Sequence, residues 1–232
     1  MSKQRDVWLR EVGTRDGLQS IATIFPTAAK LEWIRLEAAA GMPEIEVGSF
    51  VPPKLLPQMA DSAEVVAGAK RTPGLRVSVL VPNLRGAENA LASGADQLNY
   101  VLSVSEAHSR ANVRRSVQEA MDDFRRIIEY RNARPEFRHV RVAGGLATAF
   151  GCTIAGQVPV SEVFDAARKM IELGADEIAV ADTVGYANPK QCREIFKEVL
   201  TIAGEVPVAA HFHDTRGLGL ANVDAALEVG IR

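Results

Sequence analysis

A short pattern recurs along the chain, and it constrains the fold more than any other feature. The sequences AAAGMPEIEV, LASGADQLNYV and IELGADEIAVA each join a helix end, a glycine, a short turn and an apolar strand. Glycine suits this place because the residue after a helix often takes left-handed backbone angles, which are sterically costly for other residues. A fourth copy begins at ALEVGIR, where Gly230 is followed by two residues. The pattern predicts successive β/α units.

The hydrophobic periodicity supports this prediction. Longer stretches with helical periodicity lie between short apolar runs, and apolar strands that alternate with amphipathic helices indicate a parallel sheet covered by helices. The predicted strands are 6–12, 44–50, 75–82, 97–104, 139–147, 177–183 and 206–214, and the clearest helices are 28–41, 113–133, 161–174 and 189–204.

Seven β/α units and the start of an eighth predict an α/β fold, the (β/α)8 TIM barrel, with the eighth unit missing from residues 1–232. Such barrels typically need about 250 residues. An open doubly wound sheet is the alternative. The barrel is favoured because polar residues gather at the C-terminal ends of strands one, two, six and seven. We expect a single catalytic barrel domain over 1–232, incomplete at its C-terminal end.

The composition excludes several classes of protein. The net charge is −2 and the basic residues are spread along the chain, so we expect no binding to nucleic acid or to membranes. Two cysteines are compatible with a reducing compartment. The N-terminal region has no signal-peptide core, and no apolar segment reaches the ~20 residues needed to span a bilayer. We expect a soluble cytoplasmic protein.

The sequence HFHD indicates a metal site. His211 and His213 are two apart on a predicted strand, so their side chains share one face about 7 Å apart along it. Phe212 then points into the helix layer. Two neutral imidazoles, with Asp214 next, can bind a divalent metal. A pair of buried histidines satisfied by backbone groups is the alternative.

The segment LREVGTRDGLQS places Arg15, Asp16 and Gln19 just past the first strand. In a closed barrel strand one borders strand eight, and strand seven is one further round, so Asp16 could reach the axis that the two histidines face. One carboxylate and two imidazoles leave coordination positions for substrate or water. A local surface ion pair between Arg15 and Asp16 is the alternative.

Four segments, REVGTRDGLQS, EIEVGSFVPPKLLPQMAD, VADTVGYANP and HFHDTRGLGLAN, resemble the 3-hydroxy-3-methylglutaryl-CoA lyases, within the wider aldol-lyase and Claisen-condensing metal-dependent barrels. They occur in order across essentially all of the chain. The resemblance implies a (β/α)8 barrel with Mg²⁺ or Mn²⁺ that cleaves a 3-hydroxy-3-methylglutaryl-type thioester to acetyl-CoA and a 3-keto acid. It also implies an acyl-CoA substrate, a role in leucine degradation and a homo-oligomer, a dimer or larger.

The resemblance further implies roles for individual residues. These are metal ligands at Asp16, His211 and His213, a catalytic arginine at Arg15, and acidic site residues at Glu46 and Asp182. Arg15 would offset negative charge on the thioester oxygen. Glu46 would orient Arg15 or a ligand, with a structural salt bridge as the alternative. Asp182 would relay a proton or bind metal-bound water, with capping of the following turn as the alternative.

The CoA thioester has two candidate contacts, Gln19 and Lys54. Lys54 follows strand two and could reach a CoA phosphate, and a solvated lysine is the alternative. The lyases' catalytic cysteine, on a loop after strand eight, and an asparagine ligand would lie beyond Arg232. Cys152 is expected to be a small buried thiol and Cys192 a packing residue.

The chain departs from the lyase pattern at two places. It reads CTIAG at 152–156 where the family commonly has CPYEG, and Ser20 and Ile21 replace a polar pair after GLQ. Both changes predict a longer or less polar acyl group.

Two other functions are weighed. The first is a Claisen-type synthase that joins acetyl-CoA to a 2-oxo acid; those proteins usually carry TLRDGxQ, whereas Val12–Gly13 precede Thr14 here. The second is a non-catalytic barrel that binds CoA thioesters. A hydrolase with His-x-His is discounted, because its pair typically sits on strand one.

Overall fold

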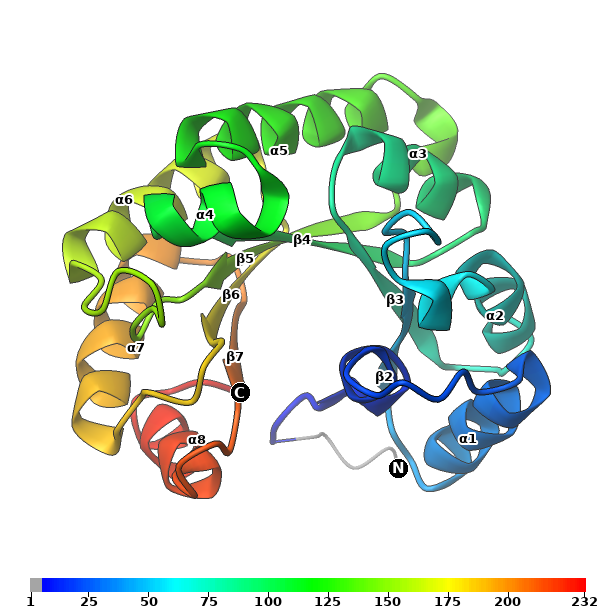
Figure 1. The fold of residues 1–232 in the computed structure, drawn as a ribbon, viewed down its shortest axis with the longest axis horizontal. Coiled ribbons are helices and arrows are strands. Elements are labelled where there is room, and N and C mark those ends of the chain that lie inside the picture. Colours follow the sequence, from blue (N-terminus) through cyan, green and yellow to red (C-terminus); the bar gives the residue numbers. More distant parts are fainter. Residues whose placement is uncertain (1–5) are drawn as a thin grey trace. The chain divides into compact units, whose positions relative to one another are not determined.

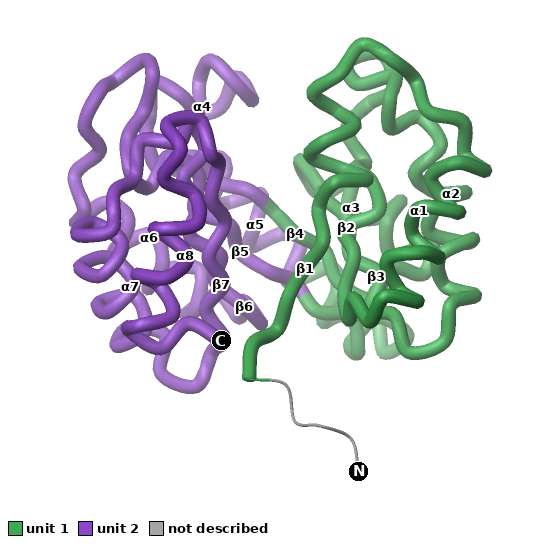
Figure 2. The backbone as a smooth tube through the Cα atoms, turned by 90° about the horizontal axis from the view of Figure 1, so that it is seen from below, with its two compact units in different colours: residues 1–100, 129–141 green, residues 101–128, 142–232 purple. Residues whose placement is uncertain are grey.

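The computed structural model describes residues 6–232. Its backbone divides into two compact units (Figure 2). Unit 1 comprises the described residues up to Tyr100 together with Glu129–Arg141, and unit 2 comprises Val101–Ile128 and Val142–Arg232. The single domain predicted over residues 1–232 stays a prediction.

Strands and helices alternate along the described chain (Figure 1). The strands are β1 (Arg10–Glu11), β2 (Glu44–Ser49), β3 (Arg76–Val81), β4 (Gln97–Ser103), β5 (Arg141–Ala147), β6 (Glu177–Asp182) and β7 (Val208–Phe212). The helices are α1 (Thr27–Ala39), α2 (Ser62–Ala69), α3 (Leu84–Ala92), α4 (Glu106–Val113), α5 (Val117–Asn132), α6 (Val160–Leu173), α7 (Pro189–Ala203) and α8 (Gly219–Glu228). A π-helical turn, Gly13–Gly17, follows β1.

Unit 1 is built on parallel strands. β1 pairs with β2, β2 with β3, and β3 with β4. All six residues of β2 are buried, which is the pattern of a strand covered on both faces. Helices α1, α2 and α3 cover one face of β2 and β3 (Figure 1), and Val65, Val66 and Leu91 pack from them into the core. The opposite face carries the polar side chains of the candidate site.

Unit 2 repeats this arrangement with β5, β6 and β7, again parallel. Helices α6, α7 and α8 cover these strands (Figure 1). Three rings, Phe150, Phe196 on α7 and Phe212 on β7, pack with centroids 5.9–6.1 Å apart. The predicted orientation of Phe212 into the helix layer is therefore confirmed.

The glycines of the recurring pattern have the backbone angles that were predicted. Gly41 and Gly174 have φ of 100°, Gly94 has 87° and Gly230 has 111°. An L side chain at these angles would be strained, so glycine ends each helix at little steric cost.

The first strand is much shorter than predicted. Only Arg10–Glu11 of the expected 6–12 pairs with β2, because the π-helical turn begins at Gly13. The side chain of Trp8 makes two contacts. Its indole N–H donates to Glu44 Oε2 at 3.0 Å, and the Arg76 guanidinium lies over its ring.

The helix expected over 113–133 is also wrong at its start. Arg114 takes left-handed angles (φ 57°) and ends α4, and α5 begins at Val117. Ser105 caps α4 by accepting from the backbone N–H of His108. The recurring pattern predicted the ends of α3 and α8, whereas α2 and α4 were not among the predicted elements.

Candidate active site

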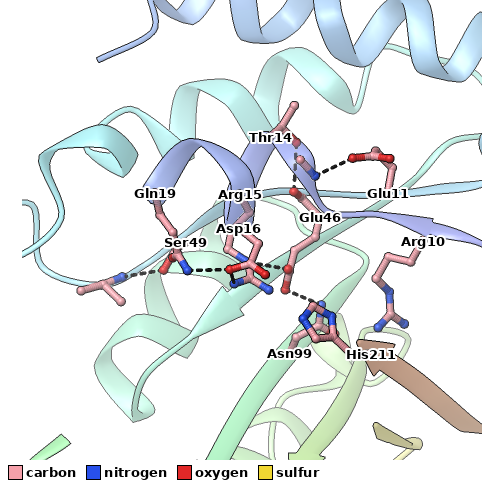
Figure 3. A network of polar contacts seen from close by, with 12 residues as sticks. Arg10, Glu11, Thr14, Arg15, Asp16, Gln19, Glu46, Ser49, Asn99 and His211 are labelled. Atoms are coloured by element: carbon pink, nitrogen blue, oxygen red, sulfur yellow. Dashed lines mark hydrogen bonds and ion pairs between the residues drawn. The ribbon is translucent and has the colours of Figure 1, made fainter. Parts of the chain in front are cut away.

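A buried arginine follows β1 in unit 1 (Figure 3). At the start of the π-helical turn, the Val12 carbonyl accepts from the backbone N–H groups of Arg15 and Asp16, at 3.1 and 2.7 Å. At its end, the backbone N–H of Leu18 donates to the Gly13 carbonyl, five residues back, as in a π-helix. The backbone N–H of Gly13 donates to Glu11 Oε1 at 2.5 Å, and a Cβ at this position would lie 2.6 Å from the same oxygen. The turn therefore projects two consecutive charged side chains from one fixed backbone.

Arg15 is held by two carboxylates. Its Nε donates to Glu46 Oε2 at 2.5 Å, and its Nη1 donates to Asp16 Oδ1 at 2.9 Å. Arg15 is 9% exposed and Glu46 2%. The expected contact between Glu46 and Arg15 is present. The Arg15–Asp16 pair also forms, but it is not the surface pair that was the alternative, because the guanidinium is buried.

Gln19 contacts Asp16 rather than standing alone. Its Nε2 donates to Asp16 Oδ1 at 2.8 Å (Figure 3). Asp16 Oδ1 thus accepts from both an arginine and an amide, which fixes the orientation of the carboxylate. Lys54 lies exposed on the loop after β2, which is compatible with the alternative that it is a solvated surface lysine.

Two residues of this network were missed from the sequence. Asn99 on β4 donates from Nδ2 to Glu46 Oε1 at 2.8 Å (Figure 3). Gln97 Nε2 in turn donates to Asn99 Oδ1 at 3.0 Å. Both are buried. The signal was available, because two amides stand inside the apolar run QLNYVLSV.

The two histidines lie together in unit 2. The Nε2 atoms of His211 and His213 are 3.2 Å apart, and the ring centroids are 5.0 Å apart. Both side chains are half-buried. The two rings lie together as predicted, but β7 ends at Phe212, so His213 follows the strand and does not lie on it. Asp214, the next residue, accepts from the backbone N–H of Gly219 at the start of α8.

Asp182 ends β6 and is 1% exposed. Its Oδ1 accepts from the backbone N–H of Tyr186 at 2.8 Å, and its Oδ2 from that of Ala187 at 3.0 Å. These contacts match the turn-capping alternative. Burial, and then the Asp182 charge, raise the pKa of Cys192 to about 12, as suits a packing thiol.

Cys152 closes the loop of the CTIAG segment. Its Sγ accepts from Ser105 Oγ at 3.5 Å and from the backbone N–H groups of Ile154 and Ala155 at 3.3 Å. Burial raises the pKa of this thiol, but the three hydrogen bonds together outweigh burial and hold the pKa below its ordinary value. The residue is 1% exposed, as predicted for a small buried thiol.

The structure thus brings Arg15, Asp16, Gln19 and Glu46 together in unit 1, and it pairs His211 with His213 in unit 2. The three-ligand metal site that would join Asp16 to the histidines stays a prediction. No helix in the described part of the chain combines the length and the apolar character needed to cross a membrane.

Parallel β/α units with polar side chains at the strand ends define an enzyme of the (β/α)8-barrel class. The family model HMGL-like matches residues 6–232. The chain belongs to this family, and the fold class predicted from the sequence is confirmed.

Individual relatives agree with this assignment. Hydroxymethylglutaryl-CoA lyase YngG of Bacillus subtilis is 36% identical over 231 residues, which cover 100% of this chain and 76% of that protein. The 3-hydroxy-3-isohexenylglutaryl-CoA/hydroxy-methylglutaryl-CoA lyase of Pseudomonas aeruginosa is 39% identical, with 100% and 76% covered. A solved HMG-CoA lyase from Acinetobacter baumannii, in complex with coenzyme A and 3-methylmalate, has a TM-score of 0.92 and 39% identity, with 100% and 75% covered.

Proposed function

We propose that this protein is a hydroxymethylglutaryl-CoA lyase. It would cleave a 3-hydroxy-3-methylglutaryl-type thioester by retro-aldol C–C scission to acetyl-CoA and a 3-keto acid. The family and the named relatives support this reaction. The observation that carries the proposal is the buried Arg15, held by Glu46 and Asp16 just past the end of β1.

Arg15 would act on the thioester. Cleavage leaves an enolate on the acetyl-CoA fragment, and a preorganised cation stabilises such charge in the transition state. The ion pairs at Nε and Nη1 hold the guanidinium plane in one orientation. The arginine therefore needs little reorganisation when negative charge develops on the thioester oxygen.

Asp16, His211 and His213 would bind a divalent metal, Mg²⁺ or Mn²⁺. The Nε2 atoms of the two histidines are 3.2 Å apart, so both imidazoles could donate a nitrogen to one ion. When bound, such an ion supplies Lewis-acid activation of the substrate hydroxyl.

A binding experiment tests the metal proposal without any turnover. We expect Asp16→Asn and His211→Ala to weaken Mn²⁺ binding by at least tenfold, measured by electron paramagnetic resonance of free Mn²⁺. Asp122→Asn is the matched control, because that carboxylate is exposed and pairs with Arg125. Equal Mn²⁺ affinity in wild type and both site variants would remove the metal from the proposal.

The carboxylate of Asp182 is already engaged in capping the turn after β6. Proton relay stays a proposal for it, since both of its oxygens already accept backbone hydrogen bonds. Gln19 would act on the substrate through Asp16, and Lys54 would meet the CoA phosphates at the surface.

We also propose that the preferred acyl-CoA substrate carries, in place of the 3-methyl group, a longer or less polar branch. Ile21, Ile24 and Leu55 expose apolar side chains (41%, 59% and 77%) on the loops after the π-helical turn and after β2. Gln58 Nε2 ties these loops together by donating to the Ile21 carbonyl at 2.7 Å. Ile154, in the CTIAG segment, is 57% exposed. We expect a higher kcat/KM for a longer 3-alkyl homologue than for the 3-methyl substrate, and a reversal of this preference in Ile21→Glu.

A coupled assay with the purified protein and Mn²⁺ tests the reaction itself. Acetyl-CoA release from 3-hydroxy-3-methylglutaryl-CoA is the expected result. Thiol release from acetyl-CoA on addition of a 2-oxo acid would instead support the Claisen-type synthase. We further propose that the enzyme acts in the cytoplasm, in leucine degradation, as a homo-oligomer.

A further inference from the structure

We infer that Asn99 is a positioning residue that fixes Glu46 and, through it, the orientation of Arg15. This inference rests on the proposed lyase function for its consequence, but the contacts that carry it are all in unit 1. Asn99 does not touch the arginine in any contact described above. It acts on the carboxylate between them.

The carboxylate of Glu46 is held from two sides. Arg15 Nε donates to Oε2 at 2.5 Å, and Asn99 Nδ2 donates to Oε1 at 2.8 Å. The Glu46 main-chain carbonyl accepts from Thr14 Oγ1 at 3.0 Å. With a donor on each oxygen, the carboxylate cannot rotate about its last torsion without losing a hydrogen bond. Arg15 therefore meets an acceptor whose position is already set.

The amide of Asn99 is itself oriented by Gln97. Gln97 Nε2 donates to Asn99 Oδ1 at 3.0 Å. That contact makes the Asn99 oxygen the acceptor and turns its NH₂ group toward Glu46. The two residues are i and i+2 on β4, so they share a face of the strand. Gln97 thus donates to Asn99, and Asn99 donates to Glu46.

The burial of this network argues for a specific role. Gln97 is 0% exposed, Asn99 9% and Glu46 2%. Asparagine is depleted in strands, and a buried amide costs free energy unless it is hydrogen-bonded. Leu98 and Tyr100, the neighbours of Asn99, are buried apolar residues of the ordinary kind. An apolar residue at position 99 would suit the strand better, so what the amide supplies is its hydrogen bond to Glu46.

Two variants test the inference. Asn99→Leu keeps a similar volume and removes the donor to Glu46. We expect kcat for acetyl-CoA release to fall about tenfold, with KM within twofold, because Arg15 is misplaced chiefly in the transition state. Asn99→Asp adds a carboxyl group that can donate to Glu46 only when it is protonated. Its activity relative to wild type should therefore rise as the pH is lowered, and that of Asn99→Leu should not.

Asn89→Asp is the matched control, since Asn89 lies exposed on α3 of the same unit. Its activity relative to wild type should not change with pH. A kcat for Asn99→Leu equal to that of wild type, with only the melting temperature lowered, would overturn the inference. If that variant does not fold, a flat relative pH profile for Asn99→Asp overturns it.

A spectroscopic measurement separates this inference from the proposed reaction. The NMR signal of Arg15 Nε–H reports its hydrogen bond to Glu46 whether or not the protein turns over substrate. We expect the signal to shift and broaden in Asn99→Leu and to stay in place in Asn89→Asp. An unchanged signal in Asn99→Leu would refute the positioning role, whereas absence of lyase activity in wild type would refute only the proposed function.

Discussion

Replacing Glu46 by glutamine tests how strongly the site holds its arginine. The side chains of Arg15 and Glu46 are 10% and 3% exposed, so solvent screens their ion pair very little. Glutamine has nearly the same shape as glutamate, but its NH₂ group would face a hydrogen-bond donor, either Arg15 Nε or Asn99 Nδ2. Removing one partner of a buried pair typically costs about 3–5 kcal/mol, and one hydrogen bond to a charged group about 1.5–3 kcal/mol. Glutamine retains one acceptor oxygen, so we expect a loss of about 3 kcal/mol in the free energy of unfolding.

Urea unfolding measures this change as a shift of the midpoint at constant slope. Glu32→Gln is the matched control, because Glu32 pairs with Arg35 on the surface of α1, where the side chains are 56% and 59% exposed. Exposed pairs of this kind contribute little, so the control should unfold like wild type. Equal midpoints for Glu46→Gln and Glu32→Gln would refute the reasoning that burial makes the Arg15–Glu46 pair strong.

Three further changes have expected outcomes. Phe196→Ala removes one ring of the Phe150–Phe196–Phe212 cluster, and calorimetry should show a loss of about 3–5 kcal/mol in the free energy of unfolding, since Phe196 is fully buried. A loss below 1 kcal/mol would contradict the packing argument. Asp182→Asn leaves one backbone N–H of its turn without an acceptor, so urea unfolding should show a loss of about 1–3 kcal/mol, and an unchanged midpoint would count against the cap. Burial lowers the pKa of His108 from its ordinary value of 6.5, so the unfolded chain binds this proton first and stability falls as the pH drops below 6.5. His108→Gln should flatten that fall in unfolding curves taken between pH 7 and 5, and an identical slope would disprove the assignment.

The repeating part of the fold could be predicted because local chemistry dictates it. Positive φ at Gly41, Gly94 and Gly174 follows from the need to end a helix without a Cβ clash. The burial of Ile45 and Val47 in β2 follows from their apolar side chains, whereas Glu44 and Glu46 are buried in ion pairs with Arg10 and Arg15. The short helix α2 escaped prediction because it has little more than two turns and contains a glycine, so periodicity is weak over its length. The length of β1 escaped because the π-helical turn that begins at Gly13 leaves no mark in the apolar periodicity.

In the candidate site, too, some residues could be predicted from the sequence and others could not. Arg15, Asp16, His211 and His213 could be identified because charged or polar groups that end apolar strands need a partner or a function. The contact between Glu46 and Arg15 followed from the same reasoning. The run QLNYVLSV shows that Asn99 is an unusual polar residue, but its partner could not be assigned, because Glu46 lies two strands away on β2 and that strand order appears only in the folded sheet.

Unit 1 is assembled from two separated stretches, and this has a consequence for synthesis on the ribosome. Its first stretch ends at Tyr100, and its last piece, Glu129–Arg141, emerges only after Val101–Ile128 of the other unit has been made. Nascent residues 6–100 must therefore wait for a segment translated later before contacts such as the hydrogen bond from the Arg141 backbone N–H to the Asp96 carbonyl can form. At about 5–20 residues per second, that wait lasts a few seconds, which is long compared with the collapse of a small chain. If the gene were divided after codon 100, the first product would lack Glu129–Arg141. If it were divided after codon 141, the first product would contain all of unit 1.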